Sequence, residues 1–152
     1  MPVLVDRFRV KASPEAVSIF HHGTSALKRL TPPPVFVRLE HVEPLAEGSK
    51  SAFTMWFGPL PVRWLAVHSA VDPACGFTDT QARGPFKRWV HQHSWQRLDD
   101  GTTLMEERIE FDHHPGLRGL LTKVLFARPL IRMMFFYRRW MIRRAVETGQ
   151  PA

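Results

Sequence analysis

The sequence has few of the features that restrict a protein to a particular environment. It has a single cysteine, Cys75, so a disulfide within the chain is excluded and a reducing compartment is expected. No uninterrupted apolar run approaches the ~18 residues that a helix needs to span a bilayer. Residues 1–9 lack the apolar stretch of a signal peptide. We therefore expect a soluble, cytoplasmic protein.

Several motifs of catalysis and cofactor binding are also missing. The chain has no G-x-S-x-G nucleophile elbow, no G-x-G-x-x-G and no P-loop, which argues against nucleophilic catalysis and nucleotide cofactors. It has no H-E-x-x-H pair and no set of cysteine ligands, and its one tyrosine, Tyr137, excludes a tyrosine-rich catalytic wall. We predict a protein with neither a metal nor a cofactor.

Acidic residues are absent from one long segment of this basic chain. Eight of the 21 Lys and Arg residues lie within 115–146, where there is no Asp or Glu, and the other 13 are balanced by all 14 acidic residues. The net charge of +7 therefore belongs to one element rather than to the whole surface. This argues against a nucleic-acid-binding protein and for a local surface property of that element.

What is present is a succession of short alternating segments, each closed by Gly or Pro. The alternation of apolar and polar residues predicts seven strands, at 3–11, 35–42, 51–57, 62–71, 77–83, 86–98 and 103–112. Consecutive hairpins predict an antiparallel sheet, and the helices are segregated from the strands. The fold class is therefore α+β, in one domain over residues 1–152.

Helices are predicted on either side of this run of strands. Ser13-Pro14-Glu15 can begin a helix, because Ser caps a helix and Pro suits its first position. Gly23 interrupts that helix, and a second short one is expected at 24–30. Residues 116–148 form a long last helix with a kink or break at Pro129.

Strand alternation also assigns side chains to faces of the sheet. Trp89, His91, His93 and Trp95 share one face of their strand, since successive side chains point to opposite sides. A face that mixes large aromatic rings with imidazoles suits the wall of a ligand cavity. We predict that the ligand-binding residues, on this strand, its neighbours and the last helix, are Trp64, His68, Phe77, Asp79, Gln81, Trp89, His91, His93, Trp95, Glu107, Ile109, Phe111, Met134 and Tyr137.

The polar members of this set have more than one interpretation. They can form a satisfied network in which Asp79 or Glu107 accepts from a histidine, or they can orient a ligand in a wet pocket. They can also act as general acid and base, with His91 or His93 beside a carboxylate. A zinc site at His68, His91 and His93 is a weaker interpretation, because H-x-H is an unspecific signal. The pairs 21–22 and 113–114, both His-His, are expected on the solvated surface.

The order of elements and several stretches carry a resemblance to a known family. These stretches are the helix start at 13–17 and the segments 58–64 (GPLPVRW), 77–81 (FTDTQ) and 84–93 (GPFKRWVHQH). Over nearly its whole length the chain resembles the START/Bet v1-like (SRPBCC) superfamily, and within it a bacterial ligand-binding branch. The resemblance implies the helix-grip fold, in which a curved antiparallel sheet of about seven strands wraps a long C-terminal helix, with two short helices after the first strand.

The resemblance implies a pocket rather than a particular chemistry. Members of the superfamily bind lipids, sterols, polyketides or plant hormones between the sheet and the last helix, and some cyclise or dehydrate polyketides. We therefore expect a small hydrophobic, lipid-like or aromatic ligand, bound without catalysis. The alternative is an enzyme of the polyketide cyclase or dehydratase type that uses the histidines and carboxylates of the same cavity.

The last helix carries both an apolar arc and a basic stripe. Leu130, Met134, Tyr137 and Met141 are predicted to face the sheet, with Met133, Phe136 and Trp140 beside them. The stripe on the opposite side is formed by Arg128, Arg132, Arg139 and Arg143. It is either a solvated face or a contact to anionic membrane, helped by Phe135, Phe136 and Trp140, as in a lipid carrier. A helix over the aromatic face would leave no platform for nucleic acid.

Overall fold

The computed structural model describes residues 1–148, which form seven strands and four helices. In chain order the elements are β1 (Val3–Val10), α1 (Pro14–His22), α2 (Ala26–Arg29), β2 (Phe36–Val42), β3 (Lys50–Phe57), β4 (Leu60–Asp72), β5 (Gly76–Arg83), β6 (Arg88–Arg97), β7 (Thr103–Asp112), α3 (Gly116–Leu125) and α4 (Arg128–Glu147). Within these residues no helix is long and apolar enough to cross a membrane.

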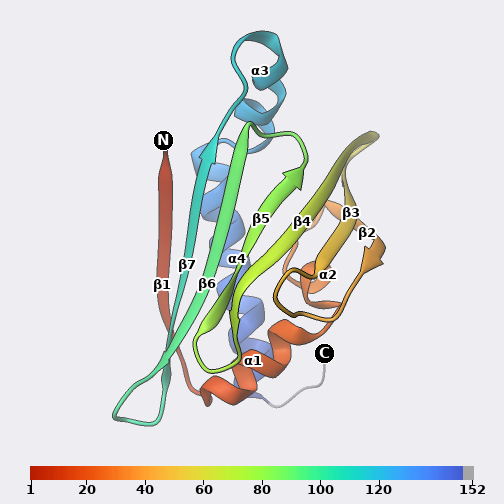
Figure 1. Cartoon of the computed structure of the whole chain (residues 1–152). Helices are drawn as coiled ribbons and strands as arrows, with labels where there is room; N and C mark the ends of the chain where they lie inside the picture. Colours follow the sequence, from red (N-terminus) through yellow and green to blue (C-terminus); the bar gives the residue numbers. More distant parts are fainter. Residues whose placement is uncertain (149–152) are drawn as a thin grey trace.

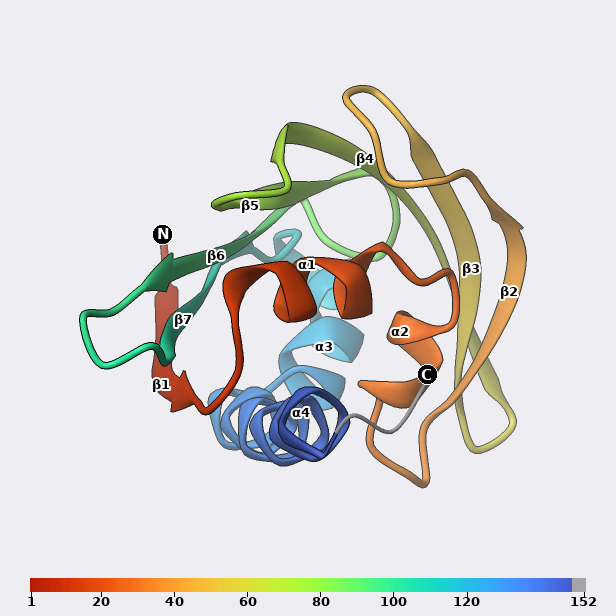
Figure 2. The same ribbon diagram turned by 90° about the horizontal axis from the view of Figure 1, so that it is seen from below.

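One antiparallel sheet contains all seven strands, in the order β1-β7-β6-β5-β4-β3-β2. The first strand of the chain therefore lies beside the last, and the hairpins follow one another across the sheet. Figures 1 and 2 show that the sheet curves around the helices, which lie on its concave side. The predicted α+β helix-grip architecture is confirmed.

Register shifts help to bend the sheet around its contents. β2 shifts against β3 between Leu39 and His41, and β4 shifts against β5 between Ser69 and Asp72. An extra residue in one strand increases the local twist and bends that strand. Ala70, within the second irregularity, has a φ of 49°, a left-handed conformation that is uncommon for a residue with a side chain.

The long C-terminal helix is divided where proline predicted it. α3 ends at Leu125, and α4 begins at Arg128 with Pro129 in its first turn. The residue before a proline is disfavoured in helical space, while proline itself suits a helix start. Two helices therefore replace the single predicted one.

The buried side of α4 differs from the predicted apolar arc. The buried residues of this helix are Ile131, Phe135, Arg138, Ile142 and Ala145. Of the predicted arc, Leu130 is exposed, and Met134, Tyr137 and Met141 are only partly buried. Because α4 carries apolar residues almost all the way round, its sequence alone does not decide which arc faces the sheet.

The basic stripe of α4 is also not a free surface along its length. Arg139 donates to Asp6 at 2.8 Å, and Arg143 donates to the carbonyl of Arg9 at 3.0 Å. Arg128 and Arg132 remain exposed, but Phe135, which was expected at a membrane interface, is buried. The four arginines therefore do not form one free stripe, since the second half packs on β1, and contact of this helix with an anionic membrane stays a prediction.

Two apolar clusters make up the core, and polar side chains lie between them. One cluster includes Trp64, Trp89 and Phe111, and the other includes Trp95 and Met105. Along the paired strands β6 and β7, the register goes from Trp89 opposite Phe111 to Trp95 opposite Met105. The inward positions between these pairs are His91, His93, Glu107 and Ile109. Three of the four are polar, so a polar centre lies in the middle of the concave face.

Candidate functional site

A cavity of about 440 Å³ lies between the concave face of the sheet and the helices. The residues around it come from the strands β2 to β6, from α1 and α2 with the proline loop that follows, and from α3 and α4. Aromatic and aliphatic side chains such as Phe53, Trp64, Trp89 and Met134 form much of its wall. Both its volume and its mainly apolar lining are typical of small-molecule sites, which measure roughly 300–1,000 Å³.

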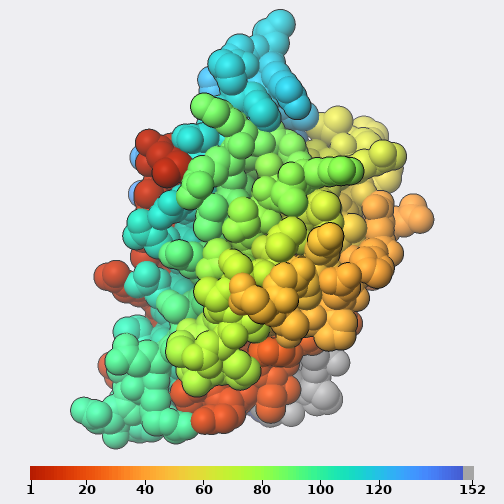
Figure 3. Space-filling model, in the orientation of Figure 1, coloured from red at the N-terminus to blue at the C-terminus, as the bar shows by residue number. Residues whose placement is uncertain are grey.

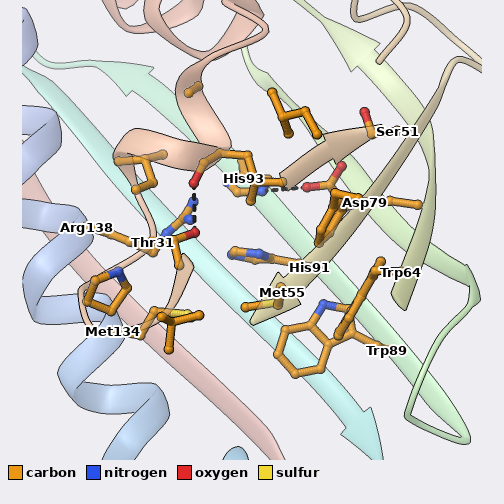
Figure 4. Close-up of a pocket in the computed structure, with 18 of the residues that line it drawn as sticks. Thr31, Ser51, Met55, Trp64, Asp79, Trp89, His91, His93, Met134 and Arg138 are labelled. Atoms are coloured by element: carbon orange, nitrogen blue, oxygen red, sulfur yellow. Dashed lines mark hydrogen bonds and ion pairs between the residues drawn. The ribbon is translucent and has the colours of Figure 1, made fainter. Parts of the chain in front are cut away.

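One wall of the cavity carries a row of hydrogen-bonded polar groups (Figure 4). One carboxylate oxygen of Asp79 lies 3.0 Å from Nε2 of His68, and the other lies 3.0 Å from Nε2 of His93. The other ring nitrogen of His68 lies 2.8 Å from the hydroxyl of Ser49, which itself accepts from the backbone of Ala46. The strand register places Asp79 on β5 directly opposite His68 on β4, and it makes His93 on β6 a diagonal neighbour of Asp79, two residues beyond His91, which lies directly opposite.

The row continues to α4 through a buried ion pair. Glu107, only 1% exposed, accepts Nε and Nη2 of Arg138 at 2.8 and 3.0 Å. On its other side Glu107 lies 3.6 Å from Nδ1 of His93 and 3.4 Å from Nε2 of His91. Arg138 is itself 6% exposed, and it also lines the cavity. Acidic and basic groups therefore alternate from Ser49 to Arg138.

This alternation controls the charge of each carboxylate and of His93. Burial alone would raise the pKa of Glu107, but Arg138, His91 and His93 outweigh it and hold that pKa well below its ordinary value. Burial would likewise raise the pKa of Asp79, but hydrogen bonds from His68 and His93 lower it. Burial disfavours the imidazolium of His93, yet the two carboxylates raise its pKa. The carboxylates of the buried Glu107 and the partly buried Asp79 are thus held ionised, and the protonated form of His93 is favoured between them.

Two further histidines are kept neutral by their surroundings. Burial, helped by the neighbouring His93, lowers the pKa of His91 to about 4 and that of His21 to about 3. The ring of His91 lies with its centroid 4.0 Å from that of His93, and His91 lines the cavity. At neutral pH, His91 therefore offers one N–H and one lone pair rather than a charge.

Eight of the predicted ligand-binding residues lie in the wall of the cavity. They are Trp64, His68, Phe77, Asp79, Trp89, His91, His93 and Met134. Seven of them follow from strand alternation, which turned residues of β4, β5 and β6 inward, and Met134 lies on α4. Their role in binding a ligand remains a prediction.

The other six predicted residues do not line it. Gln81 instead bridges the β5–β6 turn, where its side-chain amide donates to and accepts from the backbone of Phe86. Trp95 donates to the carbonyl of Pro73 and packs in the second core cluster. The remaining four are Glu107, which lies behind the histidines, Ile109 and Phe111, which are fully packed, and Tyr137, which contacts Trp140.

Two functional candidates were missed by the sequence analysis. Arg138 was counted only as part of the basic segment, although the inward Glu107 was a signal, since a buried carboxylate is stable only with a cation or strong hydrogen bonds beside it. His21 was expected on the surface, but it is 7% exposed and packs against His93 and Trp95. Its ring nitrogen Nδ1 contacts the carbonyl of Val17 one turn earlier, a bond that keeps the ring against α1.

The same groups do not make a ready metal site. Asp79, His91 and His93 offer ligand atoms within 4.8 Å of one another, as do His21, His93 and Glu107. However, Asp79 already binds two histidines, and both oxygens of Glu107 are held by Arg138. Binding a cation would break these bonds beside a buried guanidinium, so the arrangement favours the network over a metal.

Comparison with solved structures shows which fold the chain has. A protein of Thermus thermophilus superposes with a TM-score of 0.76 and 17% identity, over 99% of this chain and 100% of its own. A START superfamily protein from Mycobacterium smegmatis superposes with a TM-score of 0.67 and 13% identity, over 97% of this chain and 99% of its own. The chain has the START/Bet v1-like fold.

The START/Bet v1-like fold accommodates different activities, so it does not by itself assign one. Norcoclaurine synthase from Thalictrum flavum, solved in complex with dopamine and hydroxybenzaldehyde, shares it with a TM-score of 0.69 and 15% identity, over 99% of this chain and 89% of its own. No family model and no curated protein matches this chain by sequence. The resemblance to the superfamily is confirmed for the fold, while that to a bacterial ligand-binding branch stays a prediction.

Proposed function

We propose that the protein binds a small, largely apolar, uncharged molecule in the cavity between the sheet and α4, without converting it chemically. The observation that carries this proposal is a mainly apolar cavity of about 440 Å³ with one polar end. Neighbours of the START/Bet v1-like fold bind small ligands, which supports a small-molecule partner. A cytoplasmic location is part of the proposal and is supported by the single cysteine.

The charges of the cavity wall favour an uncharged ligand. Arg138 is paired with Glu107, and His93 lies between Glu107 and Asp79, so neither cationic side chain of the wall is left without a carboxylate partner. A fatty acid or another anion would need a positive charge that is not already paired. Bringing a carboxylate into this interior would therefore cost desolvation free energy without a matching partner.

Two groups remain to fix the polar end of the ligand. Nε and Nη2 of Arg138 donate to Glu107, whereas Nη1 has no hydrogen-bond partner in the described chain. His91 approaches Glu107 through Nε2, so an N–H at Nε2 leaves Nδ1 with a free lone pair. A hydroxyl of the ligand can donate to His91, and a carbonyl can accept from Arg138. A lipid-like or aromatic molecule with a hydroxyl or carbonyl at one end fits this pair.

Binding of a neutral fluorescent probe, N-phenyl-1-naphthylamine, tests the cavity. Ala66 is buried in its wall, so Ala66→Phe should fill the space and weaken probe binding at least tenfold. The neighbouring Val67 points to the other face of β4, and Val67→Phe should bind the probe as the parent protein does. Equal binding by two folded variants would refute the proposal. Native mass spectrometry of protein from its own host would then identify the natural ligand.

An acid–base enzyme of the cyclase or dehydratase type is the second candidate, favoured by one observation. His91 is neutral, borders the cavity and lies 3.4 Å from Glu107, as a general base with an orienting carboxylate would. The ligand released from the native protein discriminates the two functions. An enzyme returns a changed compound when that ligand is added back to fresh protein, and a binding protein returns the same compound.

A further inference from the structure

We propose that α3 docks the protein on the surface of an anionic lipid bilayer, with its apolar side chains inserted among the lipids. α3 exposes one continuous apolar face, where Leu117, Leu120, Leu121 and Val124 are 87, 54, 43 and 61% exposed. A helix with solvent on that side would normally carry polar residues there. An exposed patch of this kind on a soluble domain indicates an interaction site.

The outward orientation of these leucines is fixed by the way in which α3 is attached. Gly119 and Thr122 are the buried residues of α3. A Cβ at Gly119 would lie only 1.8 Å from the carbonyl oxygen of His114, so the helix approaches the preceding loop as closely as glycine allows. Thr122 contacts the imidazole of His113 at 2.8 Å. α3 is therefore held on its glycine side, and its leucines face away from the fold.

The surroundings of this patch are complementary to anionic lipid. Arg118 and Lys123 flank the leucines on α3, and Arg128 and Arg132 follow on the first turns of α4; all four are exposed. Residues 115–146 contain no Asp or Glu. Apolar side chains inserted at the acyl boundary, with basic residues at the level of the headgroups, are typical of helices that lie in a membrane interface. This distribution favours a bilayer over a protein partner or a second copy of the chain.

The patch continues into the mouth of the cavity. Val124 belongs to both, and on α4 Leu130 and Met133 are exposed and also line the cavity. Pro34, in the loop after α2, is exposed at the same cavity. Figures 1 and 3 show α3 projecting beyond the end of the sheet, where it is free to reach a surface before the rest of the molecule does. We infer that a ligand exchanges between the bilayer and the cavity along this route, a part of the inference that rests on the proposed function.

Vesicle co-sedimentation tests the docking. The parent protein should bind vesicles of phosphatidylcholine with about 30% phosphatidylglycerol, and less so as salt rises, because screening weakens the basic contribution. The double variant Leu117→Ser/Leu120→Ser should bind these vesicles at least tenfold more weakly. The double variant Arg118→Gln/Lys123→Gln should be weakened to the same extent. The control is Ile19→Ser, which removes a 75% exposed apolar side chain from α1, at the other end of the molecule (Figure 1), and should bind like the parent.

Three outcomes would overturn the docking surface. The parent protein would fail to bind the anionic vesicles, or the leucine variant would bind as well as the parent. Alternatively, sedimentation velocity would show a dimer that the leucine substitutions dissociate, which would make α3 a contact between copies. Probe binding measured without vesicles separates this inference from the proposed function, since the leucine variant should retain it while Ala66→Phe loses it.

Discussion

Both carboxylate oxygens of Glu107 accept from the guanidinium of Arg138, through Nε at 2.8 Å and Nη2 at 3.0 Å. This buried pair joins β7 to α4 and anchors the helix across the concave face of the sheet. The geometry is bidentate, the arrangement in which an arginine and a carboxylate interact most strongly. It explains how α4 can turn a charged residue inward next to an apolar cavity.

Removing the guanidinium of Arg138 should destabilise the fold much more than removing an exposed arginine of the same basic segment. Arg138→Met leaves the carboxylate of Glu107 buried without its main partner, and the expected loss of stability is about 3–5 kcal/mol. Urea unfolding at pH 7 measures it. Arg97→Met is the control, because its ion pair with Glu15 is exposed and its midpoint should stay close to that of the parent. A midpoint for Arg138→Met as high as that of the control would contradict a structural role for the buried pair.

The stability of the protein should decrease as the pH falls below about 6.5. The folded-state pKa of His91 is about 4, so the unfolded chain takes up a proton at His91 before the folded chain does. That difference removes stability progressively between pH 6.5 and 4, by roughly 3 kcal/mol for this residue. Asp79 and Glu107, whose pKa values are lowered, add a further loss below about pH 4.5. His93, whose pKa is raised, loses its contribution only as the pH rises above 6.5.

Unfolding curves collected from pH 4 to pH 8 test this dependence. His91→Gln should reduce the slope of stability against pH between 4 and 6.5. Gln92→Ala, a change at an exposed, non-titrating residue on the outer face of the same strand, should leave the slope unaltered. The idea fails if the parent and His91→Gln show parallel curves through that range.

Gly76, at the start of β5, should tolerate no side chain. Its φ is 140°, and a Cβ there would lie 1.9 Å from the carbonyl oxygen of His93 on the adjacent strand. Gly101 also has a positive φ, 81°, but open space around its Cβ position. Both alanine variants therefore strain the backbone, and only Gly76→Ala must also separate β5 from β6. We expect it to lose about 1–3 kcal/mol more than Gly101→Ala in thermal or urea unfolding, and equal losses would argue against this close approach.

His91 should give the cavity a preference for a hydroxyl group. 1-Naphthol should bind more tightly than naphthalene by about two- to tenfold, the value of one net hydrogen bond. His91→Phe should abolish this preference while keeping the apolar affinity. Gln92→Phe, on the outer face of the same strand, should keep it. Titration calorimetry or displacement of a fluorescent probe gives both ratios, and an unchanged preference in His91→Phe would exclude His91 from the polar end.

Much of the sheet could be predicted because alternation is a local property of the chain. Trp89, His91, His93 and Trp95 were placed on one inward face, and all four are buried. The same alternation on β7 turned Met105, Glu107, Ile109 and Phe111 inward. Because side chains alternate along a strand, the orientation of one residue fixes the orientation of all the others. A few bulky apolar side chains were therefore sufficient to predict which face is inward.

The last helix shows where this kind of prediction ends. Phe136 and Trp140 are exposed, whereas Arg138 between them is buried, because the rotation of α4 depends on what it packs against. The partner of Arg138 is 31 residues away in the chain, on a strand whose neighbours set its position. The periodicity of apolar residues in the helix therefore gives no information on the pairing of Arg138 with Glu107.

The sequence by itself determined the order of strands and helices along the chain, the consecutive hairpins, an interruption of the last helix near Pro129, the inward faces and the confinement of positive charge to one segment. Only the tertiary structure decided which of those inward residues border a cavity and which are sealed in the core. It also decided that half of the arginine stripe packs on β1, while α3 turns its leucines outward. The reason is that hydrophobic periodicity is a property of single elements, whereas cavities, buried ion pairs and exposed patches result from the way in which several elements meet.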